Sequence, residues 1–283
     1  MFTGPENSLY VKDKPKYEAI RKMANGFNSN YTGSNIIQDD IFHVMENYVS
    51  RQGMAMDLFR YPFGDDDFCA CAFIREGRLF LALNSAMPLA KQIFAAAHEL
   101  YHLYRYFENL VPVPRQTGLF LDSATIDENS AKTEGMEANA FAGLILVPSR
   151  FLHEQMDIFH ICRESTGIKD VLMLMEIFAT PYRATVFRLF EENVIAEDDV
   201  RLFFRIPEND VLSQINLTGR AKRWMRTTED EISFGSLNEN MDRALRLGTV
   251  DNRRIRQDKG RIMEIINSIT GEADRTHFPG TDR

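Results

Sequence analysis

The segment at residues 93–102 constrains this chain more than any other part of its sequence. It reads IFAAAHELYH, so His98, Glu99 and His102 stand among apolar and small residues. Such a composition predicts a packed helix, on which residues four apart project from one face. Two histidines and a glutamate inside this helix are costly to bury unless they are paired or bind a metal.

The spacing of these three residues is suited to zinc. Two neutral imidazoles one turn apart can hold one Zn²⁺, which lowers the pKa of its bound water, and the neighbouring carboxylate can take the proton of that water. The H-E-x-x-H pattern therefore predicts His98 and His102 as zinc ligands and Glu99 as general base. A catalytic zinc usually has three protein ligands, so a third is expected from elsewhere in the chain.

The surrounding sequence predicts strands before the motif helix and a second buried helix after it. The runs FCACAFI and RLFLALN, joined by residues 75–77, indicate a hairpin. The motif helix is expected to begin after Pro88 and to end before Pro112. A polar loop is expected over residues 117–132, and EANAFAGLILV predicts a buried helix that ends at Pro148.

Two of these segments, FAAAHELYH and EANAFAGLILVP, resemble in this order the ImmA/IrrE family of metallopeptidases, and RLFLALNSAMP resembles the strand that precedes them in the family. The resemblance runs from about Ile20 to Val194, since MEIFATPYRATVFRLFEENVI is similar to the family's helix-turn-helix-like segment. We therefore expect an α+β fold with a zincin-like core of the gluzincin type, a small antiparallel sheet and a helical C-terminal region. The expected division is a peptidase core at 1–155, a helix-turn-helix-like accessory segment at 156–200, and a mostly helical tail at 201–283.

The third zinc ligand is the point at which the chain departs from the family pattern. Counting back from Asn139, the ligand glutamate of the family falls at position 135, where this chain has Gly135. Glu134 needs a shift of one residue at the helix start, whereas Glu137 shares the helix face of Phe141 and points toward the core. The prediction is therefore Glu134 or Glu137, and Asn139 is expected to orient a zinc-bound histidine through its ring N–H.

The resemblance implies a zinc-dependent endopeptidase that cleaves a specific protein. In the family this substrate is typically a helix-turn-helix repressor or an antitoxin-like regulator, in regulated proteolysis linked to stress response, phages or other mobile elements. We expect the regulator to be met in trans, because there is no room for a DNA-binding domain before the core. The alternative is a regulatory or sensor module that keeps the fold and binds a protein partner without cutting it, an alternative that Gly135 favours.

Composition and charge limit the other classes of function. The formal net charge of −8 argues against broad nucleic-acid binding, which depends on many Lys and Arg contacts to phosphate. A regulator acting through residues 171–195 is further disfavoured by its single basic pair, Arg183 and Arg188.

The expected location is the cytoplasm. The N-terminal sequence lacks the apolar region of a signal peptide, and no apolar run approaches the roughly 20 residues that cross a membrane. The three cysteines, Cys69, Cys71 and Cys162, are too few for a disulfide scaffold.

Further expectations concern residues beyond 200 and the histidines outside the motif. The run RLFFRIP at residues 201–207 indicates a strand. Beyond it, basic residues interleaved with acids indicate a solvated face, in which Trp224 is a candidate partner contact. The four histidines outside the motif, His43, His153, His160 and His277, are expected to have no role in the site.

Overall fold

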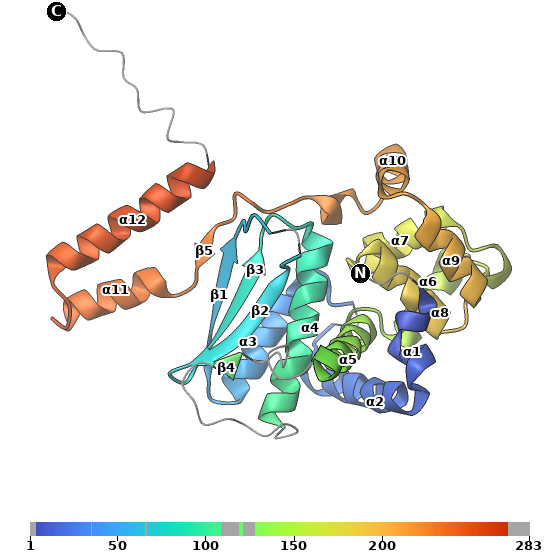
Figure 1. Cartoon of the computed structure of the whole chain (residues 1–283), viewed down its shortest axis with the longest axis horizontal. Helices are drawn as coiled ribbons and strands as arrows, with labels where there is room; N and C mark the ends of the chain where they lie inside the picture. The colour runs from blue at the N-terminus through green and yellow to red at the C-terminus, as the bar shows by residue number, and fades with distance from the viewer. Residues whose placement is uncertain (1–3, 35, 66, 109–118, 121–127, 271–283) are drawn as a thin grey trace, which may run out of the picture.

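The computed structural model describes residues 4–34, 36–65, 67–108, 119–120 and 128–270 of the chain. Its fold is α+β, with one sheet and most of the helices gathered to one side of it (Figure 1). Most of the polar loop expected at residues 117–132, and the C-terminal residues 271–283, lie outside the described residues.

The sheet has five strands in the order β4-β2-β3-β1-β5. Their bounds are β1 Ala55–Tyr61, β2 Ala70–Arg75, β3 Arg78–Asn84, β4 Leu119–Phe120 and β5 Ser233–Phe234. The predicted hairpin is confirmed, because β2 and β3 pair antiparallel. The expectation of an antiparallel sheet is wrong, because β3 also pairs with β1 in parallel. The hairpin pattern predicts only the pairing of β2 with β3. In the sheet, β3 lies between β2 and β1, and its pairing with β1 joins residues that are distant in the sequence.

Twelve α-helices are assigned among the described residues. Their bounds are α1 Leu9–Lys12, α2 Lys14–Tyr31, α3 Ile41–Arg51, α4 Leu89–Phe107, α5 Glu128–Leu146, α6 Ser149–Ile158, α7 Ile168–Phe178, α8 Tyr182–Glu191, α9 Glu197–Arg205, α10 Glu208–Thr218, α11 Leu237–Arg246 and α12 Asn252–Thr270. The motif helix is α4 and the second predicted helix is α5, which ends two residues before Pro148. None of the described helices is long and apolar enough to cross a membrane.

The strand expected at residues 201–207 is wrong, because most of that run lies in α9. Val200 and Phe203 are buried three residues apart, whereas Leu202 is 59% exposed. That spacing is helical, and Asp199 stabilises the first turn by accepting a hydrogen bond from the backbone N–H of Ala196 at 2.9 Å.

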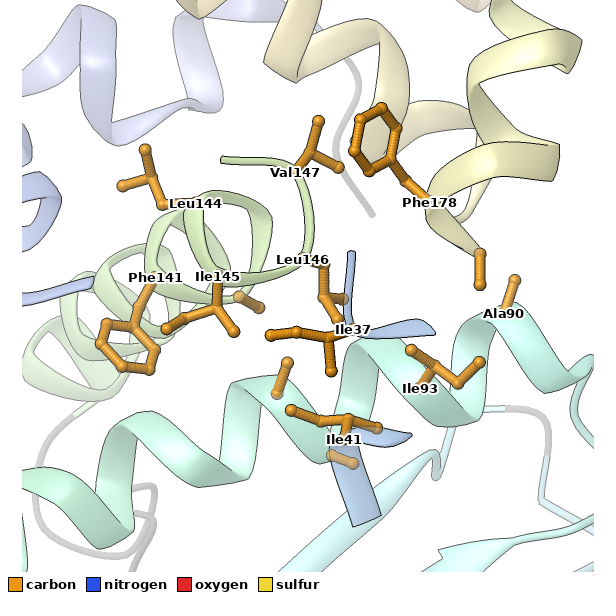
Figure 2. Packing of buried hydrophobic residues seen from close by; sticks show 14 of the residues in the cluster. Ile37, Ile41, Ala90, Ile93, Phe141, Leu144, Ile145, Leu146, Val147 and Phe178 are labelled. Carbon is orange, nitrogen blue, oxygen red and sulfur yellow. The ribbon is translucent and has the colours of Figure 1, made fainter. Parts of the chain in front are cut away.

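A buried apolar cluster holds α4 against α5 and α7. Ile93 on α4, Ile145 on α5 and Phe178 on α7 are fully buried. Ile41, at the start of α3, completes the same cluster (Figure 2). The motif helix is therefore fixed by packing on several sides.

Residues 221–236 form a strap that runs from α10 back to the sheet. Trp224 is buried at 1% exposure and donates its indole N–H to the carbonyl oxygen of Glu176 at 2.9 Å. The carbonyl oxygen of Arg226 accepts a hydrogen bond at 2.9 Å from the N–H of Leu89, the first residue of α4. Trp224 is thus an internal anchor of the strap, and its expected role as a partner contact is wrong because its ring is covered by the protein itself.

The strap ends on the sheet at Asp57. One carboxylate oxygen of Asp57 accepts a hydrogen bond from the N–H of Ser236 at 2.8 Å, and the other accepts one from Nε of Arg78 at 3.0 Å. Gly235 has a φ of +57°, and a Cβ there would lie 2.9 Å from Asp57. Only glycine fits this position without strain. Beyond it, α11 and α12 lie apart from the rest of the molecule (Figure 1).

Candidate metal centre

Helix α4 presents the motif residues between the sheet and α5. His102 and Glu99 are 2% and 5% exposed, and His98 is half-buried. The small residues Ala96 and Ala97 are fully buried, so α4 packs closely on its neighbours. The site is therefore partly shielded from water, which strengthens electrostatic interactions within it.

The two histidines face each other through their Nε2 atoms, which are 3.4 Å apart. Two nitrogens bound tetrahedrally to one zinc ion at about 2.0–2.1 Å are separated by about 3.3 Å. The separation in this protein thus matches the spacing that zinc requires. Within the described part of the chain, no third histidine, cysteine, aspartate or glutamate joins this pair in a metal-binding group.

Asn139 on α5 lies against the first histidine. Its Oδ1 atom is 2.9 Å from Nδ1 of His98. In this arrangement Nδ1 carries the proton and donates it, which leaves the lone pair of Nε2 directed toward His102. This is the geometry by which an outer group orients a metal-binding histidine.

Glu134 makes the corresponding contact with the second histidine. Its Oε1 atom lies 3.2 Å from Nδ1 of His102 and 2.9 Å from a guanidinium nitrogen of Arg105. Burial raises the pKa of Glu134, but the hydrogen bond from His102 and the charges of His102 and Arg105 outweigh it and hold the pKa below its ordinary value. The structure therefore places an ionised carboxylate on the Nδ1 side of His102.

Glu137 is placed away from both histidines. Its side chain accepts a hydrogen bond from the hydroxyl of Tyr101 and forms an ion pair of 3.1 Å with Lys16 of α2. Burial, followed by the hydrogen bond to Glu137, raises the pKa of Tyr101 above its ordinary range, so the phenol stays a donor. The role of Tyr101 and Lys16 was missed by sequence reasoning, because Lys16 is distant in the chain.

Glu99 lies against the sheet. Its Oε2 atom accepts a hydrogen bond of 3.0 Å from the backbone N–H of Ala72 in β2. Burial of Cys71 and, second, the charge of Glu99 raise the pKa of this thiol to about 11, so the thiol is protonated at neutral pH. Strand β2, which adjoins α4, thus holds the Glu99 carboxylate on the sheet side of the helix.

A model of a peptidase family, described as the IrrE N-terminal-like domain, matches residues 43–189, which include the histidine pair, Glu99, Glu134, Glu137 and Asn139. The chain belongs to this family. No curated protein gives a significant match. Among solved structures, a Mycobacterium tuberculosis transcriptional regulator is similar over 64% of this chain and 49% of its own, with 14% identity and a TM-score of 0.36. The chain therefore spans about half the length of that regulator.

In this IrrE-like chain, Asn84 of the RLFLALNSAMP segment organises a loop. Its side chain is 1% exposed, accepts hydrogen bonds from the N–H groups of Phe63 and Ala86, and donates to the carbonyl oxygens of Asp65 and Phe68. These bonds hold the chain that leads into β2. Among the described residues, the structure records no contact between this asparagine and the histidine pair.

The two predicted helices around Thr180 and Pro181 are confirmed as α7 and α8. Arg188 of the IrrE-like domain is 1% exposed and binds Glu191 at 2.6 Å and Glu192 at 2.8 Å. A buried and paired guanidinium cannot reach a phosphate, so one of the two basic residues of α8 is unavailable to DNA.

The remaining histidines lie apart from the pair. His43 is exposed, His153 lies 3.4 Å from Glu192, and His160 is exposed at the end of α6. His277 lies outside the described residues. Cys69, Cys71 and Cys162 carry free thiols.

Proposed function

We propose that this protein is a zinc-dependent endopeptidase with a zincin-like core that cleaves one specific protein. The observation that carries the proposal is the 3.4 Å separation of the two Nε2 atoms, whose rings are also held at Nδ1 by Asn139 and Glu134. Hydrogen bonds at Nδ1 fix the orientation of both rings, as outer groups do for metal-binding histidines. Membership of a peptidase family agrees with this chemistry.

In this proposal His98 and His102 hold the ion. Bound zinc would polarise a peptide carbonyl and lower the pKa of water. Glu99 takes the proton of the attacking water and returns it to the leaving amine. Its hydrogen bond from Ala72 keeps the carboxylate on the same side of α4 as the strand. Asn139 fixes the ring of His98.

We assign the acidic residue of the centre to Glu134, because it contacts a site histidine whereas Glu137 is engaged by Tyr101 and Lys16. As it lies here, Glu134 orients His102, and binding by its own oxygens requires the side chain to turn. Replacing Glu134 with Ala should weaken zinc binding roughly 10- to 100-fold, whereas Glu137→Ala should leave the affinity unchanged. Competition with a chromophoric chelator measures both, and equal loss in the two variants contradicts the assignment.

The ligand assignment itself is tested by metal content. Wild type should retain one zinc per chain after dialysis, and the double change of His98 and His102 to Ala should remove it. His153→Ala is the matched control, because its ring belongs to the Glu192 contact. Equal zinc in wild type and the double variant would overturn the proposal.

The substrate that we propose is a folded helix-turn-helix repressor or antitoxin-like regulator, met in trans in the cytoplasm. Expression of the protein with products of neighbouring genes should yield one shortened neighbour. Glu99→Gln should keep zinc and partner binding and lose cleavage, since an amide cannot accept the proton of water.

A second function is favoured by the engagement of Glu134 and Glu137 with other groups. It is a regulatory module that binds the same partner without cutting it. Capture of an uncut partner by both wild type and Glu99→Gln, with zinc present, would establish this function in place of the first.

A further inference from the structure

A small apolar pocket lies one helical turn from His98. It has a volume of about 170 Å³ and is formed where α1, α4, α5 and α8 meet. Its apolar wall includes Leu9, Phe94, Met136, Ala140, Ala184 and Phe187. Nothing in the chemistry proposed above uses this space.

Two residues of the pocket wall link it to the histidine pair. Asn139 lines the pocket and also lies 2.9 Å from Nδ1 of His98. Phe94, four residues before His98, projects from the same face of α4, about 6 Å along the helix axis. One residue of extended peptide spans about 3.3 Å, so a side chain beside a peptide bond at the histidine pair can reach this distance.

The polar groups in the pocket wall already have partners in the protein. Arg188 is bound to Glu191, and the two side chains are 1% and 6% exposed. The methylene groups of Arg188 lie against Gly143, with Cδ 3.1 Å from the position of an added Cβ. The wall also includes Arg183, whose guanidinium lies 5.3 Å from the centre of the Phe204 ring. A charged side chain must give up its hydration to enter this largely apolar space, whereas an apolar side chain has little hydration to lose.

The volume sets the size of the guest. An apolar cavity of about 150 Å³ in a protein binds benzene. The pocket is thus large enough for a phenylalanine or leucine side chain.

We infer that the pocket between α1, α4, α5 and α8 receives a large apolar side chain of the protein substrate, next to the bond that is cut. This inference rests on the proposed function, because it identifies which residue the same centre selects. A substrate with phenylalanine or leucine at that position is held with its backbone at the histidine pair. A substrate with glycine or glutamate there is not.

Binding to the pocket is measured without any need for zinc or cleavage. The full-length protein is labelled with ¹³C at its methionine methyl groups and titrated with the N-acetyl N-methylamides of Phe, Leu, Gly and Glu. Met136 in the pocket wall is the reporter, and Met263, which is 56% exposed on α12, is the internal control. The Phe and Leu amides should shift the Met136 resonance alone, with roughly 10- to 100-fold higher affinity than the Gly amide.

A variant that fills the pocket provides the second arm. Ala184→Leu should abolish the Met136 shift, whereas Ala19→Leu, the same change on the exposed face of α2, should retain it. Equal shifts from the Phe and Glu amides, or a shift that survives Ala184→Leu, would overturn the inference. If Ala184→Leu does not fold, the comparison of Phe with Glu in the wild type decides.

Digestion of a peptide library separates the pocket from the proposed activity. The zinc-loaded protein should cut preferentially beside Phe or Leu at one fixed position, and Ala184→Leu should lose that preference. Cleavage without preference refutes the pocket and leaves the peptidase. A Met136 shift without any cleavage refutes the peptidase and leaves a binding site for apolar side chains.

Discussion

Two buried tyrosines differ in what their hydroxyl groups contact. Tyr17 donates to Glu191 at 2.9 Å and accepts from Arg188 at 2.9 Å, within the buried network of α8. Tyr48 is also fully buried, but its hydroxyl has no hydrogen-bond partner among the described atoms. The same chemical group is therefore stabilising at one position and costly at the other.

The two tyrosines predict opposite effects of one substitution. Tyr17→Phe should lower the free energy of unfolding by about 1–3 kcal/mol, because it leaves buried charged groups with a missing partner. Tyr48→Phe should leave it unchanged or raise it by up to about 1 kcal/mol, because it removes an unpaired polar group. Urea denaturation of both variants measures the difference, and a loss at Tyr48 as large as that at Tyr17 would contradict this account.

The spacing of residues in the sequence predicts only those site residues that share one helix. His98, Glu99 and His102 lie on α4 together, since an i, i+4 pair shares a helix face whatever surrounds it. The choice between Glu134 and Glu137 depends on which partners other elements bring. Lys16 reaches Glu137 from α2, a contact that no periodicity in α5 encodes.

At the scale of elements, Asp57 joins β1 to the strap. Burial raises its pKa, but hydrogen bonds from Ser236 and Arg78 and the charge of Arg78 outweigh it and hold the pKa below the ordinary 3.8. The ionised form is therefore the one that stabilises the fold. A carboxylate whose pKa is lower in the folded state contributes its stability above its unfolded pKa and loses it as the pH falls.

This linkage predicts a pH-dependent difference between wild type and Asp57→Asn. Wild type should be the more stable protein at neutral pH, and the difference in unfolding free energy should shrink as the pH falls below about 4. Denaturation midpoints measured from pH 7 to pH 3 test this. Asp230→Asn, in an exposed turn of the strap, is the control and should show little dependence. If the difference in unfolding free energy between wild type and Asp57→Asn does not change with pH, the charge of Asp57 does not contribute to stability.

Elements whose signals are local were predicted, and those that depend on distant pairing were not. The β2–β3 hairpin and helices α4, α5, α7 and α8 have apolar patterns bounded by Pro or Gly. The pairing of β5 with β1 brings together residues far apart in the chain, and a two-residue strand has no period of its own. The strand expected at 201–207 was wrong because three apolar or aromatic residues in succession suit a buried strand or a helix equally.

The whole molecule consists of a body that includes the strap and a pair of helices, α11 and α12, beyond it (Figure 1). The strap contributes Trp224 to the core, whereas α11 and α12 leave Leu247 and Met263 exposed at 69% and 56%. The stability of the body should therefore depend on the strap far more than on the helices that follow it.

Two truncations test this division. A chain that ends after Ser236 should melt within a few degrees of the full chain. A chain that ends after Thr218 loses Trp224 and β5, and its melting temperature should fall by roughly 10 °C or more, because removal of one buried Trp alone costs about 3–5 kcal/mol. Thermal melts followed by circular dichroism measure both. A similar fall for the longer chain would show that α11 and α12 also support the body.

Because the strap follows the sheet and α4 in the chain, its bonds to them can form only late in the synthesis of these residues. The first N–H of the motif helix donates to the carbonyl oxygen of Arg226. Asp57 accepts a hydrogen bond from the N–H of Ser236, which follows it by 179 residues. Ribosomes add about 5–20 residues per second, so roughly 10–35 s pass between the appearance of β1 and that of its last partner. A nascent chain thus carries its histidine pair before Arg226 can bind the start of α4, and β1 gains its last partner only once residue 236 has been made.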